Sequence, residues 1–76
     1  MNAVVKDMDV LKAARVASML TQADVAKSFG CSPPTVVNQE KRPDKLSLDD
    51  LSKWYNVVSD DGKVWIKDFV DSFFVA

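Results

Sequence analysis

Gly30 separates two short helical patterns, and this boundary limits the folds open to the chain. Before it, Val25 and Phe29 recur on one side at the spacing of an α-helix. Thr21 lies three residues ahead of Asp24, which is typical of a helix start where a hydroxyl accepts a free backbone N–H. Glycine alone enters the left-handed conformation at a helix end without steric cost. The sequence therefore predicts a helix that begins after Thr21 and ends at Gly30.

A second short helix is predicted directly after this turn. Ser32 can cap its start, and Pro33 and Pro34 can lie in its first turn, where a helix leaves backbone N–H groups unpaired anyway. The pattern continues to Glu40, and Pro43 in the following loop prevents simple continuation of the helix. Two short helices joined by a turn that contains glycine form a helix-turn-helix unit.

The stretch 21–40 resembles the helix-turn-helix of phage Cro and repressor proteins, the lambda-repressor-like or Xre class. It has a small residue inside the first helix, a glycine at the turn and apolar residues around both, as that family does: Ala26, Gly30, Val25, Phe29, Cys31 and Val36. The likeness extends over residues 11–61 and includes a Leu-Thr-Gln run at 20–22. The chain departs from the family pattern at Pro33 and Pro34, where polar residues are usual, and at Gln39, where an aliphatic residue is usual. The resemblance implies an all-α domain of five helices.

The resemblance also implies roles for individual residues. It pairs Arg15 with Glu40 in a structural ion pair. This pair would tie the first of the five helices, which precedes the helix-turn-helix, to the third, which is the second helix of that unit. It implies that the third helix enters the major groove of double-stranded DNA, and that a homodimer regulates transcription in a bacterial cell. The residues implied to face DNA are Gln22, Ser32, Pro33, Pro34, Thr35, Asn38, Lys41, Arg42 and Lys45.

Two functional classes remain open on these residues. Asn38 and Thr35 can hydrogen-bond base edges, whereas Lys41 and its basic neighbours position phosphates without reading sequence. Residues 1–45 hold seven Lys/Arg and five Asp/Glu, a net charge of +2, while residues 46–76 hold three and six, a net charge of −3. This distribution fits a DNA face on the first part of the chain. The overall acidic balance favours the alternative, an anti-repressor on the same fold that binds a repressor protein.

The residue inventory excludes most catalytic chemistry. The chain has no histidine and a single cysteine, so no histidine-based triad, zinc cluster or internal disulfide can form. We therefore expect no enzyme activity, cofactor, metal or small-molecule substrate. The 76 residues allow one domain, residues 1–76. No apolar run approaches the ~18 residues of a membrane span, and there is no signal-peptide pattern, so we expect a cytoplasmic protein without a membrane partner.

The chain before the helix-turn-helix is predicted to hold one further helix. Residues 1–8 show no strong period, and we expect a loose arm there. Asp9 can cap a helix that runs from Val10 to about Met19. The side chains available for the inner face of this helix are Val10, Leu11, Ala14 and Ala17.

A fourth helix is predicted after the basic loop. Ser47 is followed three residues later by Asp50, which is a second capping pattern. An apolar stripe then recurs at i, i+3 and i+7 with a tryptophan alongside it: Leu48, Leu51, Tyr55 and Trp54. We expect this helix to run to about Asn56.

The last segment admits two structures. Asp61-Gly62 lies between two apolar runs and could form the turn of a β-hairpin. The helical spacing is better, because six apolar residues come as adjacent pairs four residues apart: Trp65, Ile66, Phe69, Val70, Phe73 and Phe74. We therefore predict an apolar helix over residues 62–75.

These six side chains cover about half of the helix circumference, which is more than a small core needs. We expect part of this surface to stay uncovered and to form a dimer or partner interface. The residues expected in this interface are Trp65, Phe69, Phe73 and Phe74. The alternative is that all six apolar residues belong to the internal core.

Overall fold

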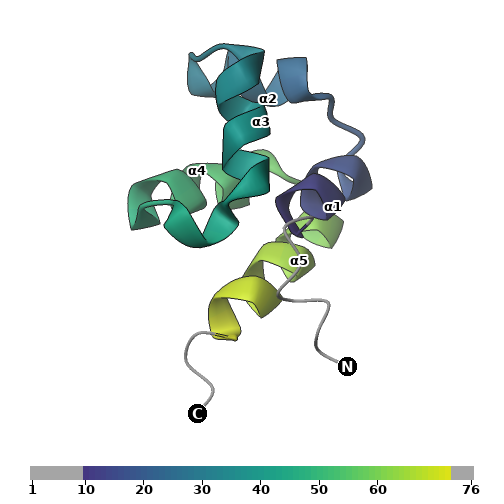
Figure 1. Cartoon of the computed structure of the whole chain (residues 1–76). Coiled ribbons are helices and arrows are strands. Elements are labelled where there is room, and N and C mark those ends of the chain that lie inside the picture. The colour runs from purple at the N-terminus through teal and green to yellow at the C-terminus, as the bar shows by residue number, and fades with distance from the viewer. Residues whose placement is uncertain (1–9, 73–76) are drawn as a thin grey trace.

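The computed structural model describes residues 10–72, which form five α-helices and one short 3₁₀ helix without any strand (Figure 1). The elements are α1 (Val10–Ala17), α2 (Gln22–Phe29), α3 (Pro33–Lys41), η2 (Pro43–Lys45), α4 (Leu48–Val57) and α5 (Asp60–Asp71). The predicted all-α architecture with five helices is confirmed over this range. The hairpin alternative for the last segment is wrong, because Asp61 and Gly62 lie in the first turn of α5. The predicted arm at residues 1–8 and the cap at Asp9 lie outside the described residues.

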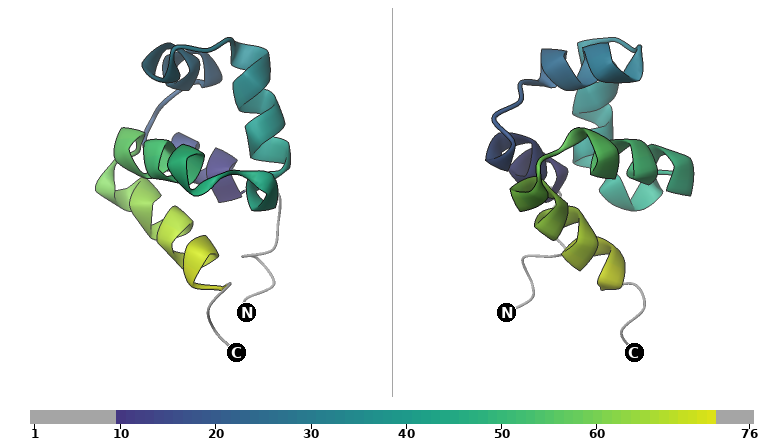
Figure 2. Two further views of the ribbon diagram at one scale, coloured as in Figure 1. Left: turned by 90° about the vertical axis from the view of Figure 1, so that its left-hand side faces the viewer. Right: turned by 180° about the vertical axis from the view of Figure 1, so that it is seen from behind.

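The five helices enclose a single core. α1 packs against α5 and α3, α2 packs against α3 and α4, and α4 packs against α5. In Figures 1 and 2, α2 lies at one end of the molecule, α5 lies at the other end, and α3 extends from α2 towards α4. Each helix contributes one of the side chains that are almost completely enclosed: Leu11, Val25, Val36, Trp54 and Ile66.

Local hydrogen bonds define both ends of α2. Thr21 Oγ1 accepts from the Asp24 backbone N–H over 3.0 Å, and the Thr21 backbone N–H donates to Asp24 Oδ2 over 2.9 Å. Gly30 ends the helix at φ 72° and ψ 33°, in the left-handed region. The Cys31 backbone N–H then donates to the Ala26 carbonyl over 3.0 Å. The predicted cap and the predicted terminating glycine are therefore confirmed.

The start of α3 differs from the prediction in its cap. Ser32 occupies the capping position, but its hydroxyl makes no hydrogen bond to the helix backbone and lies 3.3 Å from the Thr35 hydroxyl. Pro33 and Pro34 have no N–H to donate. The next N–H, that of Thr35, already donates to the Ser32 carbonyl over 3.0 Å. The two prolines thus leave the Ser32 side chain without a backbone partner.

The inner faces of α1 and α4 also differ from the predicted ones. α1 ends at Ala17, because Met19 adopts a φ of 59° that a right-handed helix cannot accommodate. Ala17 itself is exposed and does not belong to the inner face. In α4 the enclosed residue is Trp54, whereas Leu48 is 83% exposed and Tyr55 is 38% exposed. A helix rotated to bury the large indole turns the neighbouring stripe of Leu48 and Tyr55 outward.

Gly62 allows α5 to approach α1 closely. A Cβ atom at Gly62 would lie 2.6 Å from the Ala14 carbonyl oxygen and 2.8 Å from the Val58 Cβ. In the same contact, Ser18 Oγ donates to the Ala14 carbonyl and accepts from the Ser59 backbone N–H, both over 2.8 Å. The start of α5 is therefore held against the end of α1 at a spacing that only glycine permits.

Substituting Gly62 by alanine should lower the free energy of unfolding by about 1–3 kcal/mol, because the methyl group must displace backbone atoms. This loss opposes the roughly 1 kcal/mol that alanine gains over glycine within a helix. Urea denaturation followed by circular dichroism measures the difference. Ser28→Ala, at an exposed position of α2, provides the control and should be neutral or slightly stabilising. A Gly62→Ala chain as stable as the wild type would contradict the close contact.

Asp24 should make folding stability depend on pH. The Thr21 backbone N–H, followed by the Thr21 hydroxyl, holds the pKa of the Asp24 carboxyl below its usual 3.8. Because the pKa is lower in the folded state, the contribution of this carboxylate is present above the unfolded value and is lost as the pH falls through the folded value. Asp24→Asn should therefore lower the free energy of unfolding at neutral pH, and the difference from the wild type should shrink below about pH 4.

Urea denaturation at a series of pH values measures this convergence. Asp44→Asn is a suitable control, because Asp44 is exposed and makes no side-chain hydrogen bond in the described part of the chain. A difference between Asp24→Asn and the wild type that stayed constant at every pH would contradict the lowered pKa of Asp24.

Candidate nucleic-acid interface

One side of α3 is open to solvent and the other is anchored in the core. Val36 is fully buried and Glu40 is 7% exposed. Because these two residues are four apart, they lie on one face of the helix. The exposed residues of the segment include every α3 side chain that the sequence assigned to DNA, together with the capping serine: Ser32, Pro33, Pro34, Thr35, Asn38 and Lys41.

The basic residues of the interface cluster at the end of α3. Lys41 is the last residue of the helix, and Arg42 and Lys45 are exposed in the segment that follows. Pro43 is buried between them and fixes η2 against the core. Asp44 adds one exposed carboxylate to the same segment. The cluster therefore carries three positive charges and one negative charge beside the exposed face of α3.

The position of α3 depends on a nearly buried carboxylate. Arg15 Nε donates to Glu40 Oε2 over 2.6 Å, which joins the two residues that the resemblance pairs. The Arg15 guanidinium also donates through Nη1 to the Leu20 carbonyl over 3.0 Å. Glu40 Oε1 accepts from the Gln22 side-chain amide over 3.0 Å. Both carboxylate oxygens are thus satisfied, and one residue of α3 is bound to α1 and to α2.

Gln22 is placed differently from the other residues assigned to DNA. It begins α2, is half-buried, and its amide Nε2 group donates to Glu40 instead of standing free beside the exposed face of α3. The sequence did not reveal this contact, because Gln22 and Glu40 are 18 positions apart and no local period connects them. Gln22 therefore helps to fix α3 in place.

Gln39 holds α3 from the side of α4. Its Oε1 atom accepts from the indole Nε1–H of Trp54 over 2.9 Å. Trp54 is fully buried and stacks edge-to-face with Phe29 of α2, with ring centroids 5.6 Å apart and an interplanar angle of 80°. A buried indole N–H needs an acceptor, and an aliphatic residue at position 39 could not provide one. The departure of Gln39 from the family pattern is therefore matched by the tryptophan opposite it.

The predicted interface on the last helix is wrong at Phe69. Phe69 is 4% exposed and belongs to the core, whereas Trp65 is 39% exposed. Phe69 follows Ile66 by three residues and Gly62 by seven, so all three share the inner face of α5. Phe73 and Phe74 lie outside the described residues.

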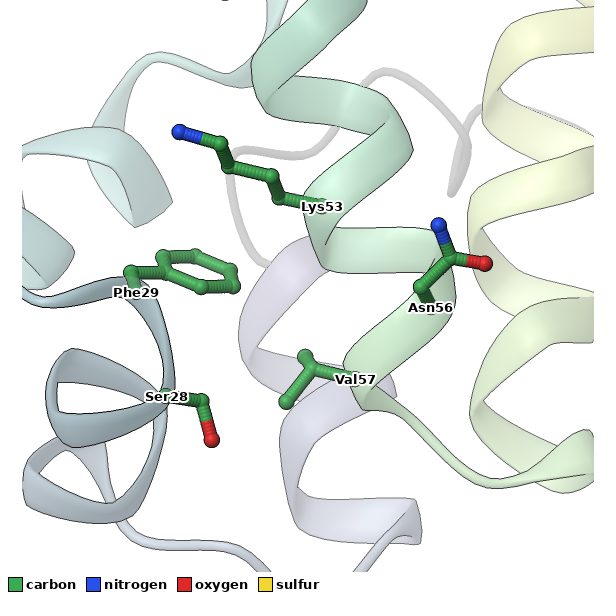
Figure 3. Close-up of a pocket in the computed structure, with 5 residues that line it drawn as sticks. All are labelled: Ser28, Phe29, Lys53, Asn56 and Val57. Atoms are coloured by element: carbon green, nitrogen blue, oxygen red, sulfur yellow. The ribbon is translucent and has the colours of Figure 1, made fainter.

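A pocket of about 300 Å³ opens where the end of α2 meets α4 (Figure 3). It is lined by Ser28 and Phe29 from α2 and by Lys53, Asn56 and Val57 from α4. Figure 3 shows the Asn56 amide pointing away from Ser28 and Phe29, so the polar groups do not converge on one point. Within residues 10–72, no three potential metal ligands lie together, and no helix is both long and apolar enough to cross a membrane.

Comparison of the chain with protein-family models, with curated proteins and with solved structures found no match.

Replacing Arg15 by methionine should lower the free energy of unfolding by about 3–5 kcal/mol, because Glu40 would remain buried without its charged partner. The double variant Arg15→Met, Glu40→Met should recover a large part of this loss. Chemical denaturation of the two single variants and the double variant gives the coupling between the residues. Lys53→Met is the matched control, because Lys53 Nζ forms an exposed ion pair with Asp49 Oδ2 over 3.7 Å. It should lower the free energy of unfolding by less than about 1 kcal/mol. Additive losses would show that the pair is uncoupled.

Proposed function

We propose that this chain is a sequence-specific DNA-binding regulator of transcription. α2, the turn at Gly30 and α3 act as a lambda-repressor-like helix-turn-helix, and a homodimer inserts α3 into the major groove. The observation that carries this proposal is the two-sided character of α3. Val36 and Glu40 anchor one side, and Thr35, Asn38 and Lys41 stand exposed on the remaining surface.

The exposed residues of α3 divide into base-reading and apolar groups. Asn38 can form two hydrogen bonds with an adenine edge, and the Thr35 hydroxyl can bond a base or a phosphate. Pro33 and Pro34 can offer only apolar contact, for example to a thymine methyl group. This combination fits a site in which an adenine and a thymine lie close together along the groove.

Phosphate contacts depend on the far end of the helix. A helix N-terminus usually binds anions through its free N–H groups. Pro33 and Pro34 remove two of these groups from α3, and the Thr35 N–H is already occupied by Ser32. Lys41, Arg42 and Lys45 are the cations beside this face and would neutralise the phosphates.

An anti-repressor role on the same fold is the second candidate. The chain has a net charge of −1, whereas nucleic-acid-binding domains are commonly basic. The apolar start of α3, at Pro33 and Pro34, would then contact a repressor protein in place of bases.

DNA titration at several salt concentrations, using the intergenic DNA that flanks the gene, tests the first proposal. Asn38→Ala should reduce discrimination between specific and unrelated DNA by about 1–3 kcal/mol, because a two-bond base contact is lost. Lys41→Ala should weaken binding to all sequences alike and lower the slope of log K against log salt by about one unit.

Lys53→Ala provides the charge-matched control, because Lys53 lies on α4 beside the pocket of Figure 3. It should leave the salt slope unchanged. No measurable binding at low salt by the folded wild-type chain would overturn the DNA proposal and favour the anti-repressor role.

A further inference from the structure

A largely apolar groove of about 320 Å³ lies between α4 and α5. In both views of Figure 2, these two helices diverge from the loop that joins them. The groove is lined by Leu48, Leu51, Ser52, Tyr55, Ile66, Lys67, Val70 and Asp71. Leu48 is 83% exposed on one side of it, although leucine gains free energy when it is removed from water. An apolar patch of this kind, bordered by charges, is typical of a protein interface.

Two charges of opposite sign follow each other along the border of the groove. Lys67 and Asp71 lie one helical turn apart on α5, and neither forms an ion pair within the described part of the chain. At the end of the groove near Tyr55, Lys63 lies over the aromatic ring, 5.4 Å from its centroid, and its charge is paired with Asp60, with 3.7 Å between Nζ and Oδ1. Leu48 begins α4 and Asp71 ends α5, so both lie at the end of the groove that is far from the loop between the two helices. Of the two unpaired charges, Lys67 is therefore nearer to the Tyr55 end of the groove and Asp71 is nearer to the Leu48 end.

We infer that a second copy of this chain occupies the groove, related to the first by a two-fold axis. A two-fold axis across the groove reverses the direction of the second copy, so the positive charge on the border of each groove meets the negative charge on the border of the other. Lys67 then faces the partner's Asp71, and Leu48 packs into the apolar floor of the partner's groove. This surface differs from the one predicted around Trp65 and Phe69.

The inference deepens the homodimer of the proposed function, but its charge argument does not involve DNA. A foreign helix would need its own charges arranged to match those of the groove. A second copy carries the matching pattern already, because the pattern is complementary to itself when reversed.

Sedimentation equilibrium of the full chain, in the absence of DNA, tests the interface. The wild type should be in equilibrium between monomer and dimer. Leu48→Lys should raise the dissociation constant Kd of the dimer at least tenfold, because a two-fold interface loses the contact twice. Each tenfold change in Kd corresponds to about 1.4 kcal/mol. Val64→Lys is the matched control, because Val64 is also on the surface, at 58% exposure, and does not line the groove. It should leave the Kd unchanged, and the melting temperature of each variant confirms that it is folded.

Charge reversal tests the predicted direction of the partner. Lys67→Asp should weaken the dimer, because it places two carboxylates opposite each other, and adding Asp71→Lys should restore it. A wild-type chain that stays monomeric at every concentration, or a Leu48→Lys dimer as tight as the wild type, would overturn the inference. A double variant as weak as Lys67→Asp alone would also overturn it. None of these results depends on DNA binding, so loss of this interface leaves the DNA contacts of α3 to be tested by the salt titration alone.

Discussion

The nearly buried carboxylate of Glu40 is the contact on which the arrangement of the first three helices depends. Its two oxygens accept from Arg15 of α1 and from Gln22 of α2, over 2.6 Å and 3.0 Å. A carboxylate removed from water is costly unless it is paired and hydrogen-bonded, so a placement of the three helices that brings both partners to Glu40 is favoured. That placement leaves Thr35, Asn38 and Lys41 together on the outside of α3.

Trp54 provides a second support for α3. Its indole N–H donates to Gln39 of α3, and its ring meets Phe29 at the end of α2. The hydrogen bond has a direction, so it limits the rotation of α3 about its own axis more than an apolar contact of the same area would. A surface that reads bases needs such fixed side chains on a rigid element. The polar contacts beneath α3 thus serve the function proposed for its exposed side.

The packing of α5 connects this core to the proposed dimer. Gly62 brings the start of α5 within contact of α1, and Ile66 and Phe69 follow on the same buried face. Because that face is directed to the core, Val70 and Lys67 are turned towards α4, where they form one wall of the groove. Rotating α4 to bury Trp54 turns Leu48 and Tyr55 to the outside, where they border the opposite wall. The apolar surface left uncovered is therefore a consequence of how the two helices meet the core.

The sequence by itself determined the features that depend on neighbouring residues. Thr21 with Asp24 and the glycine at position 30 define the ends of α2, because caps and left-handed turns require only a few consecutive residues. The family resemblance added the Arg15–Glu40 pair, which no local rule predicts. Tertiary structure decided which stripe of each helix faces inward, as Phe69 and Leu48 show, because helical spacing allows adjacent stripes and only the neighbouring helices select between them. It also decided the partners of Gln22 and Gln39, since a hydrogen bond between distant residues exists only after the helices have packed.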